Sequence, residues 1–341
     1  MKSALLVLLL AAQHVLAAKW VIDRACDNGD ATNGIKRAMK GAVQRAKTAF
    51  ARMDNPDDLT HRAVRIIIGD DDYDAKFATI KGNFEEISQI PENVYPTVYL
   101  QENGCRFLGM KDPSNIEFWC SADDNRLRQR HDGLWQDIST GDASLTWEDL
   151  SVQQRKKCHA GQPFVLTDDP NDNNLVNGEA VTARWETRID KSKGYVDGNV
   201  REARRAASID VCKFMRDMWN PKGWPTLDAA FVEKTRLPSE EKAIIDAWKV
   251  AFPGKPFVHF EALVTMEHTI LHELFHTKHG GRKLDKGRGN IDCYGFSCVA
   301  KIHEAENADS LAYLGMMLQL LDWGFMVNDQ GVVIKTGIIE E

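Results

Sequence analysis

The segment 272–276, which reads His-Glu-Leu-Phe-His, constrains the fold of this chain more than any other part of its sequence. Residues four apart lie on one face of an α-helix, so the imidazoles of His272 and His276 can reach one metal ion. Glu273 can accept a proton from a metal-bound water without binding the metal. A catalytic zinc has three protein ligands and one open position. The segment therefore predicts a zinc site with Glu273 as general base.

The sequence around this segment predicts a helix over residues 260–279. His268 and His272 form a rival ligand pair on it, but Thr269 follows His268 and cannot act as general base. We therefore expect His268 and His279 to support the site or to face solvent. Two glycines at 280–281 are typical of a helix C-terminus, and these apolar residues recur at helical spacing before them: Leu263, Met266, Ile270, Leu271, Leu274 and Phe275.

The third zinc ligand must come from farther along the chain. The long motif of the metzincin class requires glycine at position 279 and histidine at position 282. This chain has His279 and Arg282 there, which excludes that class. A carboxylate ligand is therefore expected, and these acidic residues are the candidates: Asp285, Asp292, Glu304, Glu306 and Asp309.

Two further segments carry a family resemblance. Asp-Cys-Tyr-Gly stands at 292–295 and Glu-Asn-Ala-Asp-Ser at 306–310. Together with the histidine segment, this pattern resembles the aspzincins, the deuterolysin and lysine-specific metallo-endopeptidase group of secreted fungal proteases, over residues 260–325. The resemblance implies a zincin-like domain in which Asp292 is the third zinc ligand and Tyr294 helps to stabilise the transition state. It also implies that the Asn-Ala-Asp segment lies on a packing helix.

The chain departs from the family pattern just before Tyr294. One residue separates Asp292 from Tyr294, where the family has two, and Asn-Ile stands at 290–291 in place of the usual Gly-Thr. The preceding loop is long and basic, and it contains Asp285 as a rival ligand. We rank Asp292 first, because it is the one downstream acid so closely followed by Tyr-Gly.

Asp309 has two interpretations. It can hold a ligand histidine by a hydrogen bond, since zinc-bound imidazoles usually have such a partner, or it can line the pocket for the residue after the cleaved bond. In lysine-specific members of the family, this aspartate and an acid three residues later bind lysine. The second position here is Ala312. The resemblance therefore implies a general preference for basic residues rather than strict lysine specificity.

The predicted function is that of a secreted zinc endopeptidase acting on proteins or peptides. Glu273 would activate water, and Tyr294 would hydrogen-bond the developing oxyanion. The alternative is a catalytically degenerate secreted metal-binding or effector protein, which the irregular spacing of Asp292 and Tyr294 favours. The chain has 43 Lys and Arg against 50 Asp and Glu, a net charge of −7. This composition gives no support to nucleic-acid or membrane-surface binding.

The N-terminus predicts secretion. Residues 1–17 have a basic start, an apolar stretch and small residues before a cleavage site, as in a signal peptide. We expect residues 18–341 to form a single monomeric catalytic domain, whose part up to about residue 150 is either a propeptide or a family-specific extension. Strand patterns precede helical ones, which predicts an α+β fold. The predicted strands are 64–68, 96–100, 116–119 and 163–166, and the predicted helices are 34–53, 240–252, 260–279 and 303–323.

Cysteine usage agrees with an oxidising compartment. The chain has seven cysteines, all after the predicted signal peptide. Cys105 and Cys120 flank a short hairpin-like stretch, so we expect one bridge there. A second bridge between Cys158 and Cys212 is plausible, and an odd number leaves one thiol to be accounted for.

Overall fold

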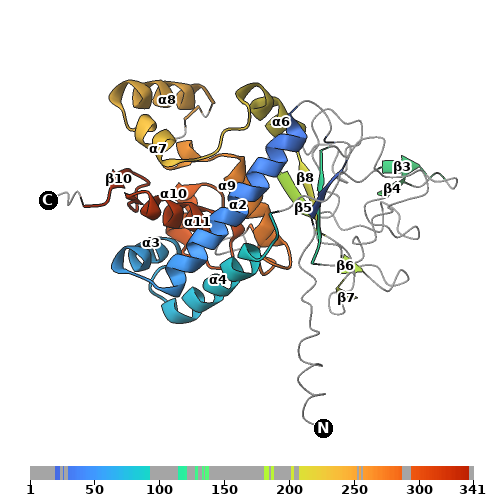
Figure 1. The fold of residues 1–341 in the computed structure, drawn as a ribbon, viewed down its shortest axis with the longest axis horizontal. Coiled ribbons are helices and arrows are strands. Elements are labelled where there is room, and N and C mark those ends of the chain that lie inside the picture. Colours follow the sequence, from blue (N-terminus) through green and yellow to red (C-terminus); the bar gives the residue numbers. More distant parts are fainter. Residues whose placement is uncertain are drawn as a thin grey trace, which may run out of the picture.

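The structure is a computed structural model that describes residues 20–23, 26, 30–92, 114–120, 127–129, 133, 135–137, 180–183, 186–187, 201–202, 207–251, 253–254, 256–285 and 293–337. The predicted signal peptide, the predicted strands 96–100 and 163–166, and Asp292 lie outside these residues. Within them the fold is a mixture of helices and strands, as the sequence predicts (Figure 1). None of the described helices is long and apolar enough to cross a membrane.

The long helix α2 (Ala31–Asp54) organises the helical part of the molecule, and Figure 1 shows it crossing that part in blue. It packs against α4 (Tyr73–Ser88), α9 (Met266–His276) and α11 (Ala308–Asp322). Its buried face is rich in small residues, which lets the neighbouring helices approach closely. At Gly41, a Cβ atom would overlap the carboxylate of Glu267 on α9. The N-terminal helices therefore share one core with the helix that carries the histidines.

The predicted strand over 64–68 is wrong, because these residues end the helix α3 (Asp58–Ile68). Their β-branched side chains favour a strand by propensity. A helix start upstream outweighs that preference, because the side chain of Asp57 accepts a hydrogen bond from the Thr60 backbone N–H at 2.7 Å. Val64 and Ile68 are then buried on one helical face.

Four strands form a mixed sheet beside the helices. Their order is β1 (Trp20–Ile22), β2 (Ile116–Trp119), β8 (Ala207–Val211) and β5 (Ala180–Ala183). The first three are parallel, and β5 runs antiparallel to β8. Alternate side chains, such as Trp20, Phe118 and Ile209, point into the common core. Because β5 contacts α9, this edge of the described sheet lies next to the histidine segment.

Shorter elements complete the described fold. The sequence predicted the helix over 240–252 and missed β1 and α4. The antiparallel pairs are β3 (Leu127–Gln129) with β4 (Trp135–Asp137), β6 (Glu186–Thr187) with β7 (Arg201–Glu202), and β9 (Phe325–Val327) with β10 (Val333–Lys335). The remaining helices are α6 (Lys213–Trp219), η5 (Asn220–Lys222), α7 (Ala229–Thr235), α8 (Pro238–Ala251), η6 (Glu261–Leu263) and α10 (Phe296–Ile302).

The predicted Cys105–Cys120 bridge is wrong, because Cys120 is bonded to Cys26. Cys26 follows β1 and Cys120 follows β2, and these two strands are parallel neighbours whose C-terminal ends meet. A second disulfide joins Cys293 to Cys298. Cys212 is also disulfide-bonded, and its predicted partner Cys158 lies outside the described residues, so this pairing stays a prediction.

A buried ion pair fastens α2 to α9. Arg45 Nη2 lies 3.0 Å from Glu267 Oε2, and Arg45 Nε donates to Gln319 Oε1 on α11 at 2.8 Å. The Arg45 side chain is fully buried. Burial lowers the pKa of Arg45 and raises the pKa of Glu267, and the attraction between the two charges opposes both shifts. The pair therefore depends on both partners being present.

We expect Arg45→Ala to lower the free energy of unfolding by about 3–5 kcal/mol, because it leaves the Glu267 carboxylate buried without its counter-charge. Denaturant unfolding followed by circular dichroism measures this loss. Lys242→Ala is the control, since it breaks only the exposed pair with Asp246 and should leave the unfolding midpoint unchanged. Equal midpoints for the two variants would contradict the importance of the buried pair.

Candidate metal centre

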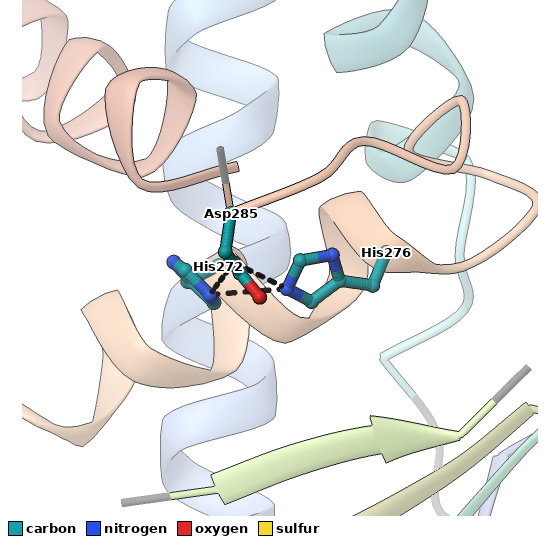
Figure 2. A group of neighbouring side chains, drawn as sticks. All are labelled: His272, His276 and Asp285. Carbon is teal, nitrogen blue, oxygen red and sulfur yellow. Dashed lines mark hydrogen bonds and ion pairs between the residues drawn. The ribbon is translucent and has the colours of Figure 1, made fainter. Parts of the chain in front are cut away.

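Helix α9 presents the two histidines of the 272–276 segment on successive turns. All of its residues are buried, and it begins after Thr265, several residues later than the sequence predicts. It ends at His276, and the chain then turns through Gly280, where a Cβ atom would overlap the backbone of Phe275. This tight turn brings the following segment back over the helix, toward the two imidazoles (Figure 2).

Three side chains converge at this point. His272 Nε2 and His276 Nε2 lie 3.1 Å apart, and Asp285 Oδ1 lies 3.1 Å from the first and 3.0 Å from the second. Figure 2 shows the carboxylate of Asp285 between the two rings. Among the described residues, these three form the one group of histidine, cysteine and acidic side chains arranged to hold a metal ion.

Hydrogen bonds at the other ring nitrogens define what the Nε2 atoms can do. His276 Nδ1 lies 2.7 Å from the backbone carbonyl of Lys283, and His272 Nδ1 lies 3.2 Å from Asp309 Oδ1. Both partners are acceptors, so each Nδ1 donates its hydrogen, and in its neutral form each ring keeps an Nε2 lone pair. Both lone pairs then face Asp285 Oδ1.

The three atoms fit a zinc ion. Ligands about 2.0–2.1 Å from a tetrahedral zinc lie roughly 3.3 Å from one another, close to the separations seen here. Asp285 Oδ1 is buried and lies 3.1 Å from His272 Nε2 and 3.0 Å from His276 Nε2. Three acceptor atoms that face one another repel unless a cation lies between them. The donor set, two imidazoles and one carboxylate, is one that zinc prefers.

The pKa values of His272 and Asp285 are both shifted toward the charged forms of these side chains. Burial alone disfavours the charged forms, but hydrogen bonding to Asp285 and Asp309 raises the pKa of His272 well above its ordinary value. For Asp285, burial is outweighed by hydrogen bonding to His272 and His276, which lowers the pKa of the carboxyl group.

Backbone pairing places Asp285. The Leu284 N–H donates to the Glu306 carbonyl at 2.9 Å, and the Ala308 N–H donates to the Leu284 carbonyl at 2.7 Å. The segment just before α11 thus holds Leu284 on both sides. The Cys293 N–H donates to the Asp285 carbonyl at 3.0 Å, which anchors the return of the chain. The ligand segment is therefore fixed by contacts with residues far along the sequence.

Asp309 serves the interior of the site. Its Oδ1 lies within 3.2 Å of His272 Nδ1 and 3.4 Å of His268 Nε2, and its Oδ2 accepts the Gly295 N–H at 2.7 Å. Burial opposes ionisation of this carboxyl group, but its hydrogen bonds to His268 and His272 hold the pKa of Asp309 well below its usual range. This geometry supports the first interpretation of Asp309, a partner that orients a ligand histidine.

The other predicted site residues lie around the centre. Glu273 is buried on α9, and its charge contributes to the raised pKa of His272. Tyr294 is 57% exposed, and its ring centroid lies 6.1 Å from that of His272. These positions are compatible with a general base and with a phenol at the mouth of the site.

The rival candidates occupy other positions. Glu306 pairs with Lys283 Nζ at 2.6 Å, and Glu304 is not part of the histidine and Asp285 group. His279 Nε2 lies 2.7 Å from the Ser114 carbonyl, away from that group. Asp292, ranked first as third ligand, lies outside the described residues, so its role stays a prediction.

Sequence reasoning missed the groups that hold the ligands in place. The Lys283 carbonyl and the Gly295 N–H are backbone groups. Every residue other than proline has both groups, so the residue type does not indicate which of them contacts the site. Asn307 carries a readable signal: its side chain accepts the Ser310 N–H at 2.8 Å and so caps α11. Its Nδ2 also donates to the Cys293 carbonyl at 3.3 Å, which ties the cap to the segment that contains Tyr294.

Comparison with known proteins adds no assignment to this geometry. The chain matches no family model, no curated protein and no solved structure. The residues of the site therefore carry the functional argument.

Proposed function

We propose that this protein is a secreted zinc-dependent endopeptidase of the aspzincin type. The observation that carries the proposal is the convergence of His272 Nε2, His276 Nε2 and Asp285 Oδ1, with Glu273 on the same turn of α9. In this proposal Asp285 is the third ligand, in place of Asp292. The disulfides and the predicted signal peptide support secretion, since such bonds persist in oxidising compartments.

Zinc is the metal that the donor set favours. Ca²⁺ and Mg²⁺ prefer shells made of oxygen atoms, whereas two imidazoles and one carboxylate suit Zn²⁺. A zinc ion supplies a Lewis acid and lowers the pKa of water to about 7. Three protein ligands are the number that catalytic zinc sites use.

The residues of the chain supply the acid–base chemistry. Glu273 takes the proton of the attacking water and passes it to the leaving amine. The Tyr294 phenol, whose ring centroid lies 6.1 Å from that of His272, donates a hydrogen bond to the developing oxyanion. Strand β5 lies at the edge of the described sheet and contacts α9, so an extended peptide that pairs with this edge would lie beside the helix that carries the histidines.

The contacts of Asp309 bear on substrate preference. Its side chain is almost fully buried, and both of its oxygens are engaged by the protein. A lysine or arginine side chain of a substrate would have to displace those bonds to reach it. These contacts argue against a preference for basic residues that depends on Asp309.

A metal-binding or effector protein without catalysis is the second candidate, and the short spacing between Asp292 and Tyr294 is what favours it. The two proposals share the metal and differ in turnover. Hydrolysis of casein by the zinc-loaded protein, and its loss on chelation, supports the peptidase. Full zinc occupancy without hydrolysis supports the second candidate.

We expect His272→Ala and His276→Ala each to remove bound zinc. The proposed site has three protein ligands, and the loss of either histidine leaves only two. Metal analysis of the purified variants measures this. His279→Ala is the matched control, since this nearby histidine bonds to the Ser114 carbonyl instead and should keep full occupancy. Zinc retained in His272→Ala would place the metal elsewhere.

A further inference from the structure

We propose that His268 is a positioning residue for the metal centre, which acts through Asp309 to hold His272 in the orientation that metal binding requires. This inference rests on the part of the proposed function that assigns zinc to His272, His276 and Asp285. It concerns a histidine that is not among the ligands and that lies one turn before His272 on α9.

His268 and His272 share one oxygen atom. Asp309 Oδ1 lies 3.4 Å from His268 Nε2 and 3.2 Å from His272 Nδ1. The second oxygen, Oδ2, accepts the Gly295 N–H at 2.7 Å. A carboxylate held by donors on both oxygens has one fixed direction, and here that direction is along His272 Nδ1. The contact with His268 therefore bears on how well Asp309 can orient the ligand ring.

The surroundings of His268 indicate that its contact with Asp309 is the reason why a histidine occupies this position. The residue is 4% exposed, and its ring centroid lies 4.4 Å from that of Tyr313 on α11. Its Nδ1 is buried and has no hydrogen-bond partner among the described residues. A buried polar atom without a partner destabilises a fold, so an apolar side chain would suit the same space better. The Nε2 bond to Asp309 is what an apolar side chain could not provide.

The same contact separates His268 from the ligands. Its Nε2 faces Asp309, whereas the Nε2 atoms of His272 and His276 face Asp285. The pair His268 and His272 therefore does not form a second ligand pair in this geometry. The two histidines instead lie on either side of one carboxylate oxygen, and only one of them reaches the metal position.

The test compares zinc affinity in His268→Leu, His268→Gln and Ile270→Ala by chelator-buffered zinc titration at fixed pH. Loss of a partner that orients a zinc ligand usually costs about 10- to 100-fold in affinity, and we expect His268→Leu to fall in this range. His268→Gln keeps an N–H donor and should recover most of the affinity. Ile270→Ala removes a buried apolar side chain from the same helix and should leave the affinity unchanged, although it unfolds more easily.

A double-mutant cycle identifies the route of the effect. In an Asp309→Asn background, His268→Leu should cause no further loss of zinc affinity, because the carboxylate through which it acts is gone. The absorption spectrum of the Co²⁺-substituted protein should change in His268→Leu and not in Ile270→Ala.

The outcomes separate the two proposals. Wild-type affinity in folded His268→Leu, an equal loss in Ile270→Ala, or additive losses with Asp309→Asn would overturn the role of His268 and leave the zinc site standing. A wild-type protein that binds no zinc would overturn both proposals. A protein that binds zinc with the expected pattern and hydrolyses nothing would overturn the peptidase alone.

Discussion

Asp285→Ala is expected to empty the metal centre, with a loss of zinc affinity well beyond the roughly 10- to 100-fold that removal of a hydrogen-bonding partner such as Asp309 costs. The carboxylate carries the negative charge of the triad formed by His272, His276 and Asp285, and its Oδ1 lies 3.0–3.1 Å from the Nε2 atoms of both imidazoles. Without it, two neutral imidazoles hold the metal alone, and zinc sites built on proteins generally need at least three ligands. Metal analysis and chelator-buffered titration of the purified variant measure the loss.

Two further variants make this result decisive. Glu306→Ala removes a nearby acid that pairs with Lys283 and lies outside the triad, so it should keep zinc at nearly wild-type affinity. Asp292→Ala tests the ligand that the family resemblance implies. If Asp292→Ala loses zinc and Asp285→Ala keeps it, the resemblance identifies the ligand correctly and the triad does not.

The two histidines could be predicted from the sequence because the signal is local. A spacing of four residues places both imidazoles on one face of any helix, and α9 forms around them within the predicted range 260–279. The acidic residue that completes the group with the two histidines could not be chosen in the same way. Asp285 reaches the site because Leu284 pairs with backbone groups at Glu306 and Ala308, and sequence spacing alone does not reveal such a pairing.

The errors in the fold prediction have the same origin. The run over 64–68 has strand-like side chains, and the helix α3 forms because Asp57 caps its start and one face packs on the core. The bond from Cys120 to Cys26 depends on β1 and β2 being parallel neighbours, although 94 residues separate the two cysteines. The local side-chain pattern thus gives the wrong element over 64–68, and pairings between distant segments depend on the assembled fold.

The role of Asp309 also depends on contacts that the sequence does not reveal. Its place in the Asn-Ala-Asp segment makes Asp309 a candidate site residue with two interpretations. The structure favours one of them, because the Gly295 N–H and two histidines use both carboxylate oxygens. The hydrogen bond from the Gly295 N–H thus helps to direct the Asp309 carboxylate toward the protein and not toward a substrate. No sequence pattern indicates this backbone contact.

Glu273→Gln is expected to retain zinc and to lose about 10²- to 10⁴-fold in kcat for peptide hydrolysis, the usual contribution of a general base. The amide has nearly the same shape as the carboxylate, so the buried site on α9 is preserved. It cannot accept the proton of the attacking water at neutral pH, because an amide nitrogen carries only donors and its oxygen is a very weak base. The effect should therefore appear in kcat and not in metal content.

The measurement combines zinc analysis with steady-state hydrolysis of a peptide by each purified protein. Glu306→Gln is the matched control, since it makes the same chemical change at an acid paired with Lys283 outside the triad and should keep wild-type kcat. Substantial turnover by zinc-loaded Glu273→Gln would remove Glu273 as the base. Loss of zinc in that variant would instead mean that the carboxylate helps to hold the metal, because its charge lies close enough to His272 to raise the pKa of that ring.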